Sequence, residues 1–309
     1  MREEDAMSST KPGWAGVFPA VTTQFHPDFS IDFPATQRMV RRLIDEGVDG
    51  IIACGSVGEN STLLPGEKRE TVAAIVEAAA GRVPVLAGLG ESNTVAACDY
   101  ARDVERLGAD GMMVMPPMIY NATPRELTQW FRTIASASDL PIMLYNNPPA
   151  YRNDLTPEFS CALADVDTIV AIKESSGDTR RVMDLRLLMM DRYILFCGLD
   201  DVVLEMACLG AVGWVSGLSN VFPKEASRLF SLGAAGRPHE ALQLYHWFMP
   251  LLHLDARSDL VQCIKLCEAI AGRGTELTRP PRLPVDADTR RHIEHSMRRM
   301  SEIRPLFEA

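Results

Sequence analysis

The chain has 309 residues, of which 47% are hydrophobic and 23% charged, and this is an ordinary globular composition. Its formal net charge of −10 argues against nucleic acid or an anionic membrane surface as the main partner. Seven cysteines occur without CxxC pairs, and no apolar run approaches the roughly 18 residues that a membrane span needs. These features predict a cytoplasmic protein.

The N-terminal residues 1–13, MREEDAMSSTKPG, are polar and lack the apolar core of a signal peptide, so we expect a disordered tail. Eight short apolar runs follow. Runs of this kind, without polar alternation, are typical of parallel strands that are buried on both faces. They span residues 16–21, 50–54, 83–89, 111–115, 141–145, 168–172, 193–197 and 212–216.

Segments with helical periodicity separate these runs. Segment 33–47 places Val40, Leu43 and Ile44 on one face, and segment 123–137 opens on a Thr-Pro-Arg-Glu capping box. Strand, loop and helix alternate eight times over about 215 residues, which is the count of a (β/α)8 barrel. A doubly wound open sheet is the alternative, but the first run lacks a GxGxxG turn after it.

We therefore predict an α/β fold, with a (β/α)8 TIM barrel over residues 14–232. Residues 233–309 have the pattern of helices with apolar faces, and no flexible linker precedes them. They are expected to form a C-terminal α-helical extension that packs on the barrel.

The first candidate for chemistry is Lys173, one of five lysines, which directly follows the run 168–172. Active sites of these barrels lie at the C-terminal ends of the strands. Burial there lowers the pKa of a lysine, and a neutral amine attacks carbonyl carbon to form a Schiff base. The alternative is a lysine paired with a buried carboxylate as a structural contact, and the residue alone leaves both open.

Two other strand ends supply polar groups. Tyr145 ends the run 141–145, where its phenol is placed to transfer protons near Lys173, although a tyrosine at the rim of the barrel is the alternative. The segment GSVGE, residues 55–59, offers Ser56 and successive N–H groups in a turn that suits a carboxylate. The six histidines fall mainly in the C-terminal helices, away from the strand ends, which argues against a metal-dependent aldolase.

Four segments, GSVGE, YNNP, VAIKESSGD and LGAVGWVSGLSN, occur in the order and spacing of one family. Across nearly its whole length the chain resembles the dihydrodipicolinate synthase / N-acetylneuraminate lyase family of barrel enzymes. The resemblance implies a class I mechanism on a 2-oxo acid such as pyruvate, in a homotetramer without metal or organic cofactor. It implies Lys173 as the Schiff-base lysine, Tyr145 as the proton shuttle, Ser56 and Val57 as the carboxylate site, and Val215 as a carbonyl that lines the pocket.

The chain also departs from the family pattern. A second threonine of the family loop, which relays protons, is replaced by Val57. In the family a neighbouring subunit contributes a tyrosine to the site. This chain has Ile119 at that position, and Tyr120 follows one residue later. The arginine that the synthases carry five residues after the tyrosine is Ala150, and Arg152 lies two residues further on.

The segments GSVGEN, PPMIY and YNNPPAYR are most similar to Δ1-pyrroline-4-hydroxy-2-carboxylate deaminases. This resemblance predicts ammonia and 2-oxoglutarate semialdehyde as products. The alternatives are a pyruvate-releasing aldolase, a 2-keto-3-deoxy sugar acid dehydratase, dihydrodipicolinate synthase itself, and a non-catalytic sensor of 2-oxo acids. Lys173 and Tyr145 favour an enzyme, whereas the altered relay favours the sensor.

Overall fold

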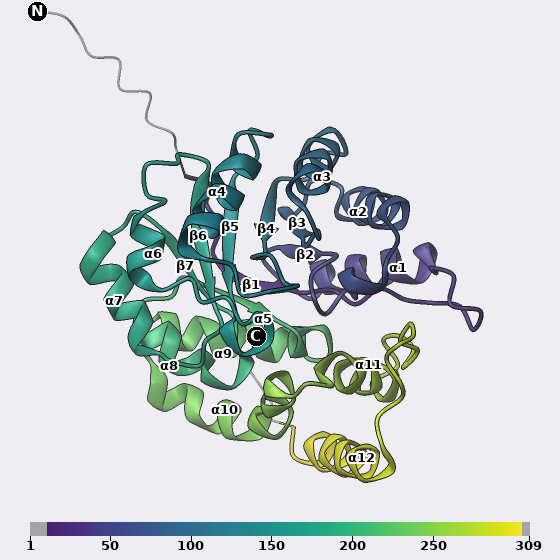
Figure 1. Cartoon of the computed structure of the whole chain (residues 1–309). Coiled ribbons are helices and arrows are strands. Elements are labelled where there is room, and N and C mark those ends of the chain that lie inside the picture. Colours follow the sequence, from purple (N-terminus) through teal and green to yellow (C-terminus); the bar gives the residue numbers. More distant parts are fainter. Residues whose placement is uncertain (1–10, 305–309) are drawn as a thin grey trace, which may run out of the picture.

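The computed structural model describes residues 11–304, and most of the predicted tail, residues 1–13, lies outside this range. Its centre is a ring of strands with helices packed around it (Figure 1). Each strand lies inside one of the eight apolar runs or extends at most two residues beyond it. The strands are β1 (Gly16–Pro19), β2 (Ile51–Ala53), β3 (Val85–Leu89), β4 (Gly111–Val114), β5 (Ile142–Asn146), β6 (Ile169–Glu174), β7 (Ile194–Cys197) and β8 (Gly213–Ser216).

The helices differ widely in length. The longer ones are α1 (Phe33–Asp45), α2 (Pro65–Ala79), α3 (Thr94–Arg106), α4 (Pro124–Ala135), α7 (Arg180–Met189), α9 (Pro223–Ala234), α10 (Pro238–Leu252), α11 (Leu260–Ile270) and α12 (Ala287–Glu302). The short ones are α5 (Pro148–Tyr151), α6 (Pro157–Cys161), α8 (Val203–Cys208) and the 3₁₀ turns η1 (Asn60–Thr62), η2 (Asp200–Val202), η3 (Leu218–Asn220) and η4 (His253–Ala256).

All neighbouring strands pair in parallel, in the order β1-β8-β7-β6-β5-β4-β3-β2. The gap between β1 and β2 is bridged just beyond β1. There Ala20 pairs with Ile52, and the Val21 N–H donates to the Ile52 carbonyl at 3.1 Å. The ring is therefore nearly closed, which confirms the predicted (β/α)8 TIM barrel.

Aromatic side chains fill the barrel interior near the N-terminal ends of the strands. The rings of Phe18 on β1 and Phe196 on β7 meet edge to face, with 5.2 Å between their centroids. Two glycines leave space for these rings. A Cβ at Gly50 would lie 2.3 Å from the Phe18 ring, and a Cβ at Gly213 would lie 2.1 Å from the Phe196 ring. The two rings and the two glycines therefore form part of the packed interior of the barrel.

Helix starts follow the predicted capping chemistry. Before α4, the Thr123 hydroxyl accepts from the Glu126 N–H while the Glu126 carboxylate accepts from the Thr123 N–H at 2.7 Å. In α1, the residues Val40, Leu43 and Ile44 form the buried face as expected.

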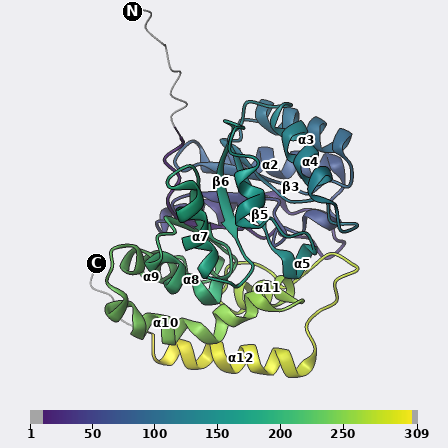
Figure 2. The ribbon, with the colours of Figure 1, turned by 60° about the vertical axis from the view of Figure 1, so that its left-hand side comes forward.

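The helices after the barrel pack against it and against one another. Figure 2 shows α12 running alongside α10 and α11, on the side away from the strands. An ion pair between Lys265 of α11 and Glu59, both fully buried, joins this group to the loop after β2 with 3.1 Å between Nζ and Oε1. The predicted boundary between residues 232 and 233 falls within α9, and the division into barrel and extension stays a prediction.

Within residues 11–304, no helix combines the length and the apolar character that a crossing of a membrane requires.

Candidate active site

The ends of β5 and β6 bring Tyr145 and Lys173 together. The two residues are direct partners in the strand register, so their side chains leave the sheet side by side. Lys173 Nζ lies 3.9 Å from the centroid of the Tyr145 ring, and both side chains are buried. The amine therefore lies over the ring face, while the phenol oxygen accepts a hydrogen bond from Asn147 Nδ2 at 3.1 Å.

Burial lowers the pKa of Lys173, because the barrel end removes water from around the ammonium. The negative charge of Asp255 opposes this shift most strongly among the neighbouring groups. Burial likewise raises the pKa of the Tyr145 phenol. The pair thus combines an amine with an increased neutral fraction and a phenol that keeps its proton, and this combination suits addition to a carbonyl or imine carbon.

The loop after β2 presents unused N–H donors at the same barrel end. Cys54 has a left-handed backbone conformation, with φ of 53°, and its carbonyl oxygen accepts a hydrogen bond from Asn60 Nδ2 at 2.8 Å. Within the described residues, the backbone N–H groups of Ser56 and Val57 make no hydrogen bond. Because both residues line the cavity that contains Lys173, their N–H groups are free for an anionic ligand.

Tyr151 supplies a hydroxyl that the sequence interpretation missed. It ends the short helix α5, which begins where the Asn147 side chain accepts from the Ala150 N–H at 3.1 Å. Its hydroxyl is hydrogen-bonded to Ser56 Oγ, and its ring meets the Tyr145 ring edge to face at 5.4 Å. A hydroxyl from the same chain therefore stands near the place where the family threonine is lost at Val57.

These groups surround one cavity of about 140 Å³. All five sequence-predicted site residues, Lys173, Tyr145, Ser56, Val57 and Val215, line it. Residues from the C-terminal extension complete its wall and were not predicted from the sequence: Asp255, Ser258, Leu260, Val261 and Arg282.

The positions that depart from the family pattern lie in different places. Ala150 lines the cavity, whereas Arg152 lines a separate hollow beside α4 and α6. Tyr120 and Ile119 are exposed and outside the cavity lining, so within one chain neither replaces the lost relay. Besides Lys173, the cavity lining formed by the described residues contains one further cationic side chain, Arg282. Its Nη1 lies 3.7 Å from Glu59 Oε2.

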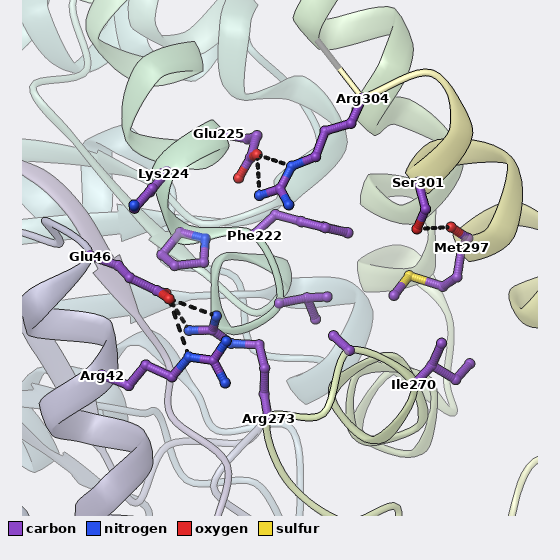
Figure 3. A pocket seen from close by; sticks show the side chains of 13 residues that line it. Arg42, Glu46, Phe222, Lys224, Glu225, Ile270, Arg273, Met297, Ser301 and Arg304 are labelled. Carbon is purple, nitrogen blue, oxygen red and sulfur yellow. Dashed lines mark hydrogen bonds and ion pairs between the residues drawn. The ribbon is translucent and has the colours of Figure 1, made fainter. Parts of the chain in front are cut away.

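A larger cavity of about 390 Å³ lies between α1, α9, α11 and α12 (Figure 3). Its charged side chains mostly pair with one another: Arg42 and Arg273 contact Glu46, and Arg304 contacts Glu225. It contains neither Lys173 nor another lysine buried beside a proton carrier, so the smaller cavity is the candidate active site. Within residues 11–304, no three His, Cys, Asp or Glu side chains cluster as metal ligands would.

Comparison with known proteins identifies the family. The sequence model of the dihydrodipicolinate synthetase family matches residues 13–300. The chain belongs to this family. Its members are class I Schiff-base lyases, so the chain is an enzyme of that class, and the predicted family and enzyme type are confirmed.

Several members of the dihydrodipicolinate synthetase family are similar over most of their length. The 4-hydroxy-tetrahydrodipicolinate synthase of Methanothrix thermoacetophila is 32% identical over 289 residues, which cover 93% of this chain and 97% of the relative. The solved structure of the synthase from Methylacidiphilum fumariolicum SolV has a TM-score of 0.90 and 30% identity, covering 94% of this chain and 96% of that one. A prophage protein of the family from E. coli K12, solved in complex with pyruvate, has a TM-score of 0.88 and 26% identity, covering 94% and 99%.

The site residues that were not predicted differ in whether a local sequence pattern could have indicated them. Tyr151 follows an Asn-Pro pair, which is a helix-start signal that could have placed its side chain on a short helix instead of a loop. Asp255 and Arg282 lie in segments with helical or proline-rich character far from any strand end. No local pattern marks them, because only the packing of the extension brings them to the cavity.

Proposed function

We propose that the protein forms a Schiff base through Lys173 and deaminates Δ1-pyrroline-4-hydroxy-2-carboxylate. The observation that carries the proposal is the Lys173 amine, buried in a cavity that also presents Tyr145 and the free N–H groups of Ser56 and Val57. The N–H groups hold the 2-carboxylate, and this places C2 of the substrate beside the amine.

The chemistry balances with these groups alone. Lys173 Nζ bonds to C2, the ring nitrogen takes a proton from Tyr145, and the C2–N bond breaks, which leaves an open-chain Schiff base with an amine on C5. Loss of a C3 proton and of the C4 hydroxyl then expels water. Protons shift from C5 and its nitrogen to C3 and C4. One water hydrolyses the C5 imine to release ammonia, and another hydrolyses the Schiff base, so one water is consumed overall.

The cavity wall supports a substrate with one carboxylate. Ala150 stands where the synthases keep an arginine for a second carboxylate, and Arg152 lies in a different hollow. Losing a bidentate contact from arginine to a buried carboxylate costs several kcal/mol. The small volume of about 140 Å³ also suits a compact five-membered ring.

The test measures imine formation and product release separately. Borohydride reduction in the presence of pyruvate, followed by peptide mass spectrometry, is expected to label Lys173 and not Lys224, an exposed lysine outside the cavity. Incubation with the hydroxy-pyrroline is expected to release ammonia and 2-oxoglutarate semialdehyde, read through a coupled semialdehyde dehydrogenase. Labelling at another lysine would refute the Schiff-base assignment, and labelling of Lys173 without ammonia release would refute the substrate.

A second candidate function is 4-hydroxy-tetrahydrodipicolinate synthesis, the activity for which the similar relatives are named. One observation favours it: Arg282 lines the cavity, and within the described residues its guanidinium donates no hydrogen bond. Although Arg282 lies 3.7 Å from Glu59, its hydrogen-bond donors are available to a second carboxylate. Two results together would favour this function over the deaminase. The parent protein would condense pyruvate with aspartate semialdehyde but would not turn over the hydroxy-pyrroline, and the condensation would be lost in Arg282→Gln.

We also infer a homotetramer in the cytoplasm. Exposed Ile119 and Tyr120, at the position through which the family contacts a neighbouring subunit, support an interface. The seven cysteines are all unpaired, which supports a reducing compartment.

A further inference from the structure

Asp255 places a carboxyl group in the wall of the Lys173 cavity. It lies in η4, the turn between α10 and α11, and therefore comes from the C-terminal extension and not from a barrel strand. Among the residues that line this cavity it is the one with a carboxyl group. The reaction proposed above uses Lys173 and Tyr145 but assigns no group to the departing hydroxyl.

The two oxygens of Asp255 have different surroundings. Oδ2 accepts a hydrogen bond from the Asp200 N–H at 3.1 Å, and this contact fixes the orientation of the side chain. Within residues 11–304 no hydrogen bond reaches Oδ1. A Cβ built on Gly217, which also lines the cavity, would lie 3.5 Å from Oδ1, so this oxygen stands at the cavity wall.

Burial keeps a fraction of the Asp255 carboxyl protonated, and the charges around this carboxyl modify the effect. Burial raises the pKa of its carboxyl most strongly, and the nearby charge of Lys173 opposes this rise. The negative charge of Asp201 raises the pKa further, while the Asp200 N–H lowers it. Burial raises the pKa of the Asp200 carboxyl well above its usual value, and the Asp255 charge raises it further.

We propose that Asp255 donates the proton with which the C4 hydroxyl of the substrate leaves as water. The proposal rests on the proposed function. In this step the electron pair of the C3–H bond forms the π bond between C3 and C4 of the unsaturated imine, the C4–O bond breaks, and the Asp255 proton joins the departing oxygen. Tyr145, which gave its proton to the ring nitrogen during ring opening, takes up the C3 proton on its phenolate oxygen, so the two proton transfers of this step use different groups.

The phenols of the cavity are weaker acids than a carboxyl. Burial raises the pKa of Tyr145 and of Tyr151 above the usual value for tyrosine. Hydroxide is a poor leaving group, and it departs most easily when the proton comes from the strongest acid that is still protonated. Asp255 meets this requirement better than either tyrosine does.

The experiment compares Asp255→Asn with Asp259→Asn, a matched substitution four residues later at a side chain that pairs with Arg257 and does not line the cavity. Asparagine keeps an oxygen for the Asp200 N–H but cannot transfer a proton. Two readouts are taken for each protein: the exchange of pyruvate methyl protons in D₂O, followed by NMR, and the turnover of the hydroxy-pyrroline. Exchange needs the imine and removal of a C3 proton, whereas turnover also needs loss of the hydroxyl.

We expect Asp255→Asn to retain exchange within about threefold and to lose about 10²–10⁴-fold in turnover, as is typical for a positioned acid. Asp259→Asn should retain both. Equal loss of exchange and turnover in Asp255→Asn would overturn the proposal, since the residue would then act on the imine or the fold. Unchanged turnover would overturn it as well.

Failure of the proposed function gives a different pattern. If the parent protein exchanges pyruvate protons but leaves the hydroxy-pyrroline intact, the same pair of variants is assayed on a 2-keto-3-deoxy sugar acid, which also loses a C4 hydroxyl. Selective loss of that dehydration in Asp255→Asn supports the role of Asp255 with another substrate. A parent protein that removes water from neither compound overturns both the function and the inference.

Discussion

The side chain of Lys173 can cross the barrel end only because Gly198, at the end of β7, has no side chain. A Cβ at Gly198 would lie 2.6 Å from Lys173 Cγ, 2.7 Å from Lys173 Cε and 2.1 Å from Ser175 Oγ. The nearest contacts thus involve both the stem of the lysine and a buried hydroxyl behind it. The glycine is required here for space and not for an unusual backbone angle.

Gly198→Ala is therefore expected to displace Lys173 and to reduce turnover by about 10²-fold, the usual cost of a misplaced reacting group. The yield of the borohydride adduct with pyruvate should fall in parallel. Gly66→Ala is the control, because a Cβ there meets nothing within 4 Å. Full adduct yield in Gly198→Ala would show that the lysine reaches the substrate by another route.

Tyr151 is the second residue whose role can be tested singly. Its hydroxyl is hydrogen-bonded to Ser56 Oγ and its ring packs against the Tyr145 ring, so we expect it to relay protons without a partner subunit. Tyr151→Phe is expected to lower kcat by about 10²–10⁴-fold while KM changes little. The exposed Tyr120 gives the control Tyr120→Phe, which should retain activity. The reverse result, with Tyr120 essential and Tyr151 dispensable, would assign the relay to the subunit interface.

At the scale of elements, α11 determines how the extension contacts the barrel. Besides the buried pair of Lys265 and Glu59, its Glu268 carboxylate accepts from the Thr22 hydroxyl at 2.8 and 3.0 Å, next to the end of β1. Burial raises the pKa of Glu268 to about 7 from its usual value of 4.5. The folded protein therefore retains a proton that the unfolded chain releases, and ionisation of Glu268 destabilises the fold as pH rises through this interval.

Glu268→Gln removes this titration. The free energy of unfolding of the variant, relative to the parent, is expected to rise by about 2–3 kcal/mol between pH 5 and pH 8, from about 1.4 kcal/mol for each pKa unit. Urea denaturation at several pH values measures the difference. Glu276→Gln, at a surface pair with Arg290, should show no such trend. A constant difference across this range would mean that Glu268 is ionised throughout.

The elements also show how far sequence reasoning reaches. The strands were predictable because each is buried on both faces and therefore reads as a continuous apolar run, and Lys173 and Tyr145 stood out as polar residues that interrupt or end such runs. Helix α5 was not predicted, since four residues are too few for a periodic pattern. Asp255 and Arg282 were not predictable in this way, because their approach to the cavity depends on tertiary packing alone.

At the scale of the whole molecule, several large apolar side chains remain on the surface. Ile119 is 77% exposed, Leu187 is 77% exposed and Met190 is 78% exposed. Single apolar side chains are common on protein surfaces, so a subunit interface is inferred from Ile119, which falls at the position through which the family contacts a neighbouring subunit.

Ile119→Asp is expected to lower the mass of the assembly measured by light scattering, because a carboxylate in an apolar interface loses its water without gaining a partner. Val95→Asp is the control, since Val95 is 72% exposed on α3, away from the loop that contains Ile119. An unchanged mass in Ile119→Asp, or a monomeric parent protein, would contradict the inferred tetramer. A family variant described as monomeric shows that the fold does not by itself require assembly.

The cavity wall built by η4 and by the segment after α11 has a consequence for the order of synthesis. The ribosome makes Lys173 and Tyr145 well before Asp255 and Arg282, so a nascent chain that has completed β8 already carries the reactive amine but not the wall around it. In that interval water reaches the amine, and its pKa returns toward the usual lysine value. A chain that ends before η4 is therefore expected to carry a Lys173 amine that is more fully protonated, and less nucleophilic, than the amine in the folded protein.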